Sequence, residues 1–104
     1  MSDSNVHTRV EPLRLSGRLD ATSTDALDRL LKAEFDAGAV LLVLDLGAVT
    51  YASTSALRSL LLAQRRQQTR GGEVVLINIP ARIRRVLTLC GFDRVFDLGL
   101  PASN

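Results

Sequence analysis

The sequence has no tryptophan, one cysteine and one histidine, and these shortages exclude several kinds of site. With Cys90 alone the chain cannot form an internal disulfide, and it does not open with a charged segment followed by an apolar one. We therefore expect a protein of the reducing cytoplasm. His7 lies in a polar N-terminal stretch where no orienting acid can be assigned, and no glycine-rich phosphate loop is present. We expect no catalytic residues, no metal site and no cofactor.

Long apolar segments and nucleic-acid-binding motifs are also missing. The longest uninterrupted apolar run, from Ala39 to Leu44, is far shorter than the roughly 20 residues of a membrane-spanning helix. The formal net charge is only +2, and no helix-turn-helix pattern accompanies the arginines. We expect neither membrane insertion nor direct binding to nucleic acid.

The chain is long enough for one domain with an aliphatic core. It has 104 residues, of which only 4% are aromatic, so leucine, valine and isoleucine must fill the interior. Strand-like and helix-like segments alternate as β-α-β-α-β-α-β, which predicts a single α/β domain with a mainly parallel open sheet and crossover helices. Residues 1–9 are expected to form a mobile arm or an incomplete first strand, and residues 99–104 a tail.

Periodicity and punctuation by glycine and proline place the elements. Pro12 has no amide hydrogen, so it should delay the first strand or make it an edge strand. Glycines end each helix-like segment, and the aliphatic second strand should be buried on both faces. The predicted strands are Val10–Leu19, Val40–Leu46, Glu73–Ile79 and Val95–Leu98, and the helices begin near Thr22, Ser53 and Pro80. The predicted core includes Val43, Leu57, Leu61, Leu76, Val86 and Cys90.

Polar residues follow several predicted strands, at the edge where open α/β sheets gather functional groups. Asp20 and Asp45 are expected at carboxyl ends of strands, where the simpler interpretation is that Asp20 caps a helix and Asp45 accepts backbone amides. Ser53, Thr54 and Ser55 precede the second helix. They are either helix caps or sites where free amides and the helix dipole favour an added phosphate.

Five short motifs, in this order, are similar to those of the STAS domain family, which includes bacterial anti-sigma factor antagonists and cytoplasmic domains of sulfate transporters. The likeness covers about nine tenths of the chain by this comparison of motifs. The motifs are Leu-Ser-Gly-Arg-Leu-Asp-Ala at Leu15 to Ala21, Val-Leu-Asp-Leu-Gly-Ala-Val-Thr-Tyr at Val43 to Tyr51, Ser-Ala-Leu-Arg at Ser55 to Arg58, Gly-Gly-Glu-Val-Val-Leu-Ile-Asn at Gly71 to Asn78, and Arg-Arg-Val-Leu-Thr-Leu-Cys-Gly-Phe at Arg84 to Phe92.

The resemblance implies partner switching: the unmodified chain binds an anti-sigma factor, usually a serine kinase of the GHKL ATPase type, and phosphorylation releases it. Aligned on Leu57, the family's phosphorylated serine is Ser55, with Thr54 and Ser53 as alternates. Ser53 stands where phosphorylated relatives have aspartate. Ala56 stands where they have glycine, which adds a methyl where a kinase must approach. The predicted partner-binding residues are Asp20, Ser53, Thr54, Ser55 and Arg58.

Other functions remain open at this point. A small STAS subunit of an ABC-type lipid transporter or a stressosome-like scaffold would use the same surface at the second helix. An enzyme is disfavoured because no acid–base pair can be placed. The N-terminus is too short for the family's full opening hairpin, and an uncovered sheet edge would favour a homodimer.

Overall fold

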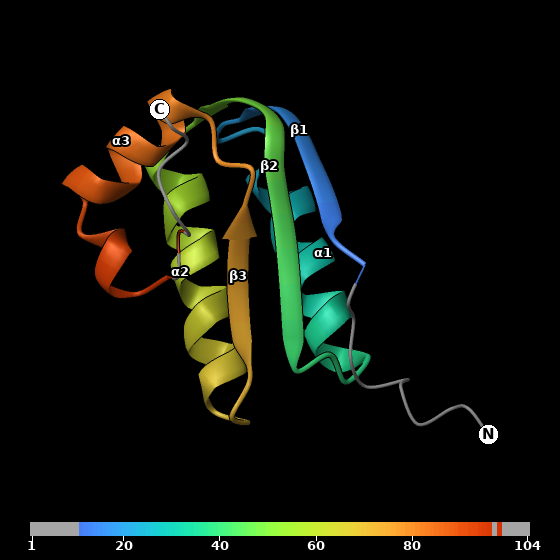
Figure 1. The fold of residues 1–104 in the computed structure, drawn as a ribbon. Coiled ribbons are helices and arrows are strands. Elements are labelled where there is room, and N and C mark those ends of the chain that lie inside the picture. The colour runs from blue at the N-terminus through green and yellow to red at the C-terminus, as the bar shows by residue number, and fades with distance from the viewer. Residues whose placement is uncertain (1–10, 97, 99–104) are drawn as a thin grey trace.

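The computed structural model describes residues 11–96 and 98, so the expected arm at residues 1–9 and tail at residues 99–104 lie outside the described residues. Within this range, strands and helices alternate along the chain (Figure 1). The elements are β1 (Leu13–Leu19), α1 (Thr24–Asp36), β2 (Leu41–Ala52), α2 (Thr54–Gln68), β3 (Glu73–Ile77), α3 (Ala81–Leu89) and the 3₁₀ turn η2 (Phe92–Arg94).

The strands form one parallel sheet in the order β1-β2-β3. Parallel neighbours need a crossover connection, which α1 supplies between β1 and β2 and α2 supplies between β2 and β3. Both helices lie on the same side of the sheet, behind it in Figure 1, whereas α3 and η2 lie toward the β3 edge. The predicted fold class, an α/β domain with a parallel open sheet and crossover helices, is confirmed.

The core lies between the sheet and its helices. Along β2 every second side chain is buried, at Leu42, Leu44 and Leu46, and the intervening side chains are only half-buried. The prediction that this strand is buried on both faces is therefore wrong, because α1 and α2 pack against one of them. The helices contribute Leu27, Leu31, Leu57, Leu60, Ala63, Ile83 and Leu87, and β3 contributes Val74 and Leu76.

The second strand is longer than its aliphatic segment, and Gly47 does not end it. Beyond Asp45, where β3 stops, β2 continues along β1 to Ala52, with register shifts on the β1 side. This second part of β2 pairs with one neighbouring strand and lacks the continuous apolar run by which the first part is recognised in the sequence. Pro12 does delay β1, which begins at Leu13.

The predicted fourth strand at Val95–Leu98 is wrong for the residues of this range that the structure describes, since Val95, Phe96 and Leu98 belong to no strand. The amide of Phe96 donates to the carbonyl of Phe92 at 2.8 Å, and the carbonyl of Val95 accepts from Gln64 Nε2 at 2.9 Å. These backbone groups are engaged in a turn and with a side chain, so they are not free for a β-ladder. The ring of Phe96 is buried and stacks on Phe92, which explains why the segment is apolar without being a strand.

Several predicted core positions are less buried than expected. Leu57 and Leu76 are buried, as predicted, but Val43, Leu61 and Val86 are half-buried. Cys90 is exposed, so its assignment to the core is wrong. The reason is that α3 ends at Leu89 and Cys90 is its C-cap, one step beyond the helical turn that would have faced the core.

The glycine pair before β3 makes the predicted turn. Gly71 has a φ of +77°, which favours glycine. At Gly72 an added Cβ would lie 2.8 Å from the Gln67 side-chain oxygen and closer still to the carbonyl of Val40. The turn therefore needs glycine at both positions, for conformation at the first and for close approach at the second.

Candidate functional site

The end of β1 and the start of α2 meet at one edge of the sheet. Leu19 and Ala52 are register partners at the ends of β1 and β2, and the amide of Ser53 donates to the carbonyl of Leu19 at 2.8 Å. Because the strands are parallel and adjacent, the segments that follow them emerge together. Asp20 and the hydroxyl residues before α2 thus come from distant parts of the sequence to neighbouring places.

Asp20 organises the turn that leads into α1. Its Oδ1 accepts hydrogen bonds from the hydroxyl of Thr22 at 2.6 Å and from the Thr22 amide at 3.1 Å. The Thr22 hydroxyl is the main cause of a lowered pKa for the Asp20 carboxyl, and Arg18 contributes through its charge, 3.6 Å from Oδ2. The helix begins at Thr24 with Ser23 as its N-cap, so Asp20 shapes the approach to α1 without capping it.

Ser53 is the N-cap of α2, as predicted. Its backbone is extended, and its Oγ accepts a hydrogen bond from the amide of Ala56 at 3.1 Å. This bond satisfies one of the amides that the first helical turn leaves without a partner, which is the ordinary role of a capping serine. Thr54 and Ser55 then occupy the first two helical positions, and both are exposed.

The side chain of Ala56 points into the domain. Its side chain is 0% exposed and belongs to the hydrophobic core cluster. The extra methyl, compared with a glycine at this position, is therefore accommodated inside the domain. The expectation that this methyl lies where a kinase must approach is wrong.

A shallow hollow of about 280 Å³ lies between the first turns of α1 and α2. The α1 wall carries Asp28, and the α2 wall carries Arg58 and Leu62, a leucine whose side chain is 48% exposed. Asp20 and Ser53 lie outside its lining. The complete lining is Thr24, Asp28, Thr54, Ser55, Arg58, Ser59 and Leu62.

Sequence reasoning missed the α1 wall and Leu62. The pairing of α1 with α2 across the hollow is a tertiary contact, so nothing in the sequence around Asp28 indicates it. The sequence does hold a signal for Leu62, because three consecutive leucines cannot all lie on one core-facing stripe of a helix. In the structure Leu60 is buried and Leu61 is half-buried, so Leu62 is the leucine that lies off this stripe. An apolar residue displaced from that stripe is a candidate for contact with another molecule.

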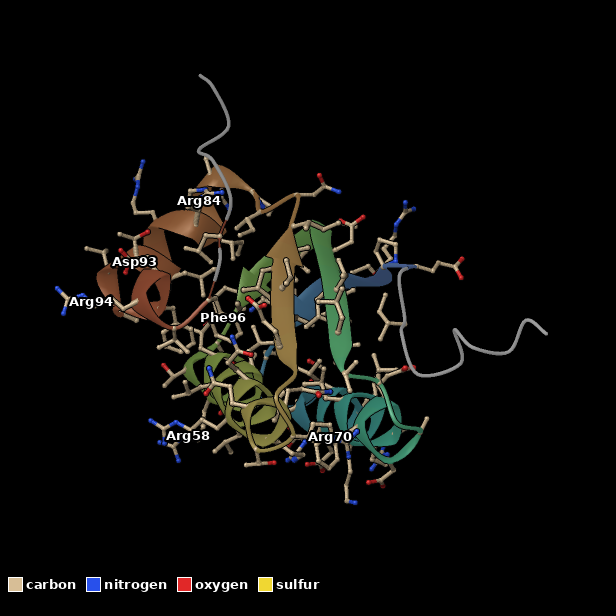
Figure 2. The ribbon with its side chains drawn as sticks, turned by 60° about the horizontal axis from the view of Figure 1, so that its bottom comes forward. Arg58, Arg70, Arg84, Asp93, Arg94 and Phe96 are labelled. Atoms are coloured by element: carbon tan, nitrogen blue, oxygen red, sulfur yellow. The ribbon has the colours of Figure 1, made fainter. Side chains whose placement is uncertain are left out.

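The exposed face of α2 is positively charged. Within Thr54–Gln68 the charged residues are Arg58, Arg65 and Arg66, and the helix contains no carboxylate. Figure 2 shows the Arg58 side chain projecting away from the ribbon of α2. A helix N-terminus adds partial positive charge at the same end as Ser55 and Arg58. This surface is suited to negatively charged groups.

Asp45 occupies a different place from the one predicted. It lies within β2 and not at its end, although it is opposite Ile77, the last residue of β3. Its Oδ1 accepts the amide of Gly47 at 2.8 Å, and this bond is the main cause of a lowered pKa, with further contributions from Asn78 and Arg14. The simpler of its two interpretations, that it accepts backbone amides from a loop, is right about the backbone amide, but the donor Gly47 belongs to β2 and not to a loop.

Two absences concern the described residues. Across residues 11–96 and 98, no three His, Cys, Asp or Glu side chains are grouped so that they could bind a metal ion. None of the helices in the described part of the chain is long and apolar enough to cross a membrane. His7 lies outside the described residues.

The chain is similar to known proteins in family, in sequence and in structure. The family model for the STAS domain matches residues 3–102. A protein of Bordetella bronchiseptica (strain ATCC BAA-588 / NCTC 13252 / RB50), BtrV, is named as a candidate anti-sigma factor antagonist. It is 33% identical over 84 residues, which cover 81% of this chain and 72% of BtrV.

Solved structures with the same fold include two anti-sigma factor antagonists. One, from Mycobacterium paratuberculosis, has a TM-score of 0.73 and 27% identity, with 86% of this chain and 75% of that chain covered. The other is SpoIIAA in its unphosphorylated form, with a TM-score of 0.72, 18% identity, and coverage of 84% and 76%. SpoIIAA of Bacillus in its phosphorylated form has a TM-score of 0.69 and 17% identity, with 91% and 85% covered.

Proposed function

This chain belongs to the STAS domain family, and we propose that it acts as an anti-sigma factor antagonist, by binding a partner protein and not by converting a substrate. The observation that carries the proposal is the 33% identity to BtrV over most of both chains. The likeness to the mycobacterial antagonist, at 27% identity, points the same way. Sigma factors act on RNA polymerase, so this role places the chain in the cytoplasm.

The proposed partner is an anti-sigma factor that is also a serine kinase of the GHKL ATPase type. The unmodified chain binds this partner and thereby frees the sigma factor. The binding face consists of Asp20, Ser53, Thr54, Ser55 and Arg58, extended by the exposed Leu62 beside the hollow. A positively charged helix with one exposed leucine matches a partner surface that combines carboxylates with an apolar patch.

Regulation is proposed to occur by phosphorylation of Ser55. The Ser55 oxygen attacks the γ-phosphorus of ATP bound to the kinase, the bond to ADP breaks, and the hydroxyl proton passes to a base of the kinase. Ser55 is exposed and is a better acceptor than Ser53, whose oxygen caps the helix through the amide of Ala56. Because Ser55 is exposed, a phosphate at this position alters the surface without disturbing the core.

The proposal is tested with the partner itself. The tagged chain is used to recover bound proteins from the source cell, and a recovered anti-sigma factor is then purified in complex with its sigma factor. Addition of this chain should release the sigma factor and restore transcription in a reconstituted assay. Recovery of a transporter ATPase in place of an anti-sigma factor, or failure to release the sigma factor, would reject the proposed function.

The binding face is tested by reversing one charge on it. Arg58→Glu should weaken binding to the identified partner, because the partner's carboxylates would then face a negative charge. Arg85→Glu on α3 is the matched control, since Arg85 is also exposed but lies on another helix. Normal binding by the Arg58 variant together with loss of binding by the Arg85 variant would show that the face is assigned wrongly.

A further inference from the structure

Ser55 and Arg58 are placed to interact if Ser55 carries a phosphate. They are three residues apart on α2, both are exposed, and both line the hollow between α1 and α2. Residues at this spacing are neighbours on a helix, with Cβ atoms about 5–6 Å apart. Long side chains on helices lean toward the N-terminus, so the turn that contains Ser55 is within reach of the Arg58 side chain.

Among the residues that the structure describes, Arg58 has no carboxylate partner. It belongs to none of the ion pairs that join residues of the described part of the chain. In the lining of the hollow, the acidic residue is Asp28, which lies on the wall facing Arg58. The guanidinium is therefore available either to a carboxylate of a partner or to a phosphate on its own helix.

We propose that a phosphate on Ser55 is bound by Arg58 of the same chain, so that phosphorylation removes the arginine from the partner-binding face. This inference rests on the proposed function and adds a mechanism of regulation to it. Partner release then has two causes. One is the negative charge of the phosphate, and the other is the loss of an arginine that had been free to bind carboxylates.

The charges around the site favour this pairing. A phosphoserine carries about −1.5 to −2 charges near pH 7 and offers three acceptor oxygens, which match the fork of donors on a guanidinium. The partial positive charge at the N-terminus of α2 also attracts the phosphate, as Arg58 does. Asp28 acts against it, because a carboxylate across the hollow repels the phosphate. Arg18 and Asp20, in the neighbouring turn, are already paired with each other at 3.6 Å.

The pairing can be tested without a kinase or a partner. Protein with a phosphate on Ser55 is made by incorporating phosphoserine at that codon, and the second ionisation of the phosphate is followed by ³¹P NMR as the pH is varied. An arginine that binds the dianion lowers the pKa of this ionisation. Arg58→Gln should therefore raise it by about 0.5 pH unit, the size expected for an exposed ion pair.

Two further variants make the result specific. Asp28→Asn should lower the pKa of the phosphate, because it removes a repelling charge. Arg65→Gln is the matched control, since Arg65 is an exposed arginine of the same helix two turns farther from Ser55, and it should leave the pKa unchanged. Folding of each variant is checked by its NMR spectrum.

The outcome separates this inference from the proposed function. If Arg58→Gln leaves the pKa of the phosphate where it is in the parent, or if Arg65→Gln changes it equally, Arg58 does not bind the phosphate and the inference is rejected. That result would leave the proposed partner untouched. Conversely, failure to release a sigma factor would reject the proposed function while the measured pairing stood.

Discussion

Gln64 of α2 accepts a hydrogen bond from the backbone amide of Val74 in β3, with 2.7 Å between Oε1 and N. The side chain of Gln64 is 1% exposed, and its Nε2 donates to the carbonyl of Val95 at 2.9 Å. One amide group thus satisfies two backbone groups from separate segments. Gln64 thereby occupies a backbone hydrogen-bond donor of the edge strand β3. This leaves fewer free backbone groups on that edge to pair with a strand of a second copy of the chain.

Replacement of Gln64 should be costly because of these two bonds. Gln64→Met keeps the approximate size but leaves the amide of Val74 and the carbonyl of Val95 without partners. A buried unpaired group costs about 1–3 kcal/mol, and of these two bonds the one to Val74 is fully buried, so the free energy of unfolding should fall by about 1–3 kcal/mol. Urea denaturation measures it. Gln68→Met, at an exposed position of the same helix, should change it little, and equal effects of the two substitutions would contradict this account.

The register of α2 can be checked with two adjacent leucines. Leu60 is 1% exposed and lies in the core cluster, whereas Leu61 is half-buried. Leu60→Ala should therefore lower the free energy of unfolding by about 2–5 kcal/mol, and Leu61→Ala by clearly less. Thermal or urea denaturation of both variants decides between them. A larger loss for Leu61→Ala would support the prediction from the sequence that Leu61 is a core residue.

The stability of the fold should depend on the ionisation of Asp45. Its pKa in the folded state is lowered, chiefly by the amide of Gly47, so the carboxylate stabilises the fold above the unfolded value of about 3.9. This contribution is lost as the pH falls through the folded pKa. Asp45→Asn should be less stable than the parent near pH 7, and the difference should shrink in acid.

Urea denaturation at a series of pH values measures this difference. Asp93→Asn, on the exposed turn η2, is a control for the loss of one negative charge elsewhere on the surface. A gap between the parent and Asp45→Asn that stayed constant from pH 7 into acid would show that the carboxylate does not stabilise the fold in the way its contacts suggest.

Local signals in the sequence were sufficient where one residue or one short run determines the structure. The capping role of Ser53, the glycine turn before β3 and the helix-breaking positions follow from residue type. Longer-range features did not follow. The segment around Phe96 is apolar because its ring packs into the core, and its backbone is engaged by the carbonyl of Phe92 and by Gln64, which the local sequence does not reveal.

The residues of the candidate site fall into the same two groups, those that the local sequence indicates and those that it does not. Ser55 and Arg58 could be chosen from the motif at the start of α2, because that motif is local. Asp28 could not, since it reaches the hollow through the packing of α1 against α2. Burial of Ala56 was equally hidden, because the sequence shows which residue replaces glycine but not which way its methyl points.

The final prediction concerns where the kinase acts. Incubation with the cognate kinase and ATP should place one phosphate on Ser55 in preference to Ser53 or Thr54. Ser55 is exposed at the start of α2, where free amides and the helix dipole stabilise a phosphate, while Ser53 is engaged as the N-cap. Ser55→Ala should abolish incorporation, and Ser55→Asp, with less charge than a phosphate, should weaken partner binding only in part.

Tandem mass spectrometry of the treated protein locates the phosphate, and the kinase is shown to be active on a second substrate in the same experiment. Thr54 is the informative alternative, because it is also exposed and lines the same hollow, four residues before Arg58. A phosphate found only on Thr54 would move the acceptor by one residue and contradict the alignment on Leu57. No phosphate at any of the three positions, with an active kinase, would mean that this chain is switched by something other than phosphorylation at the start of α2.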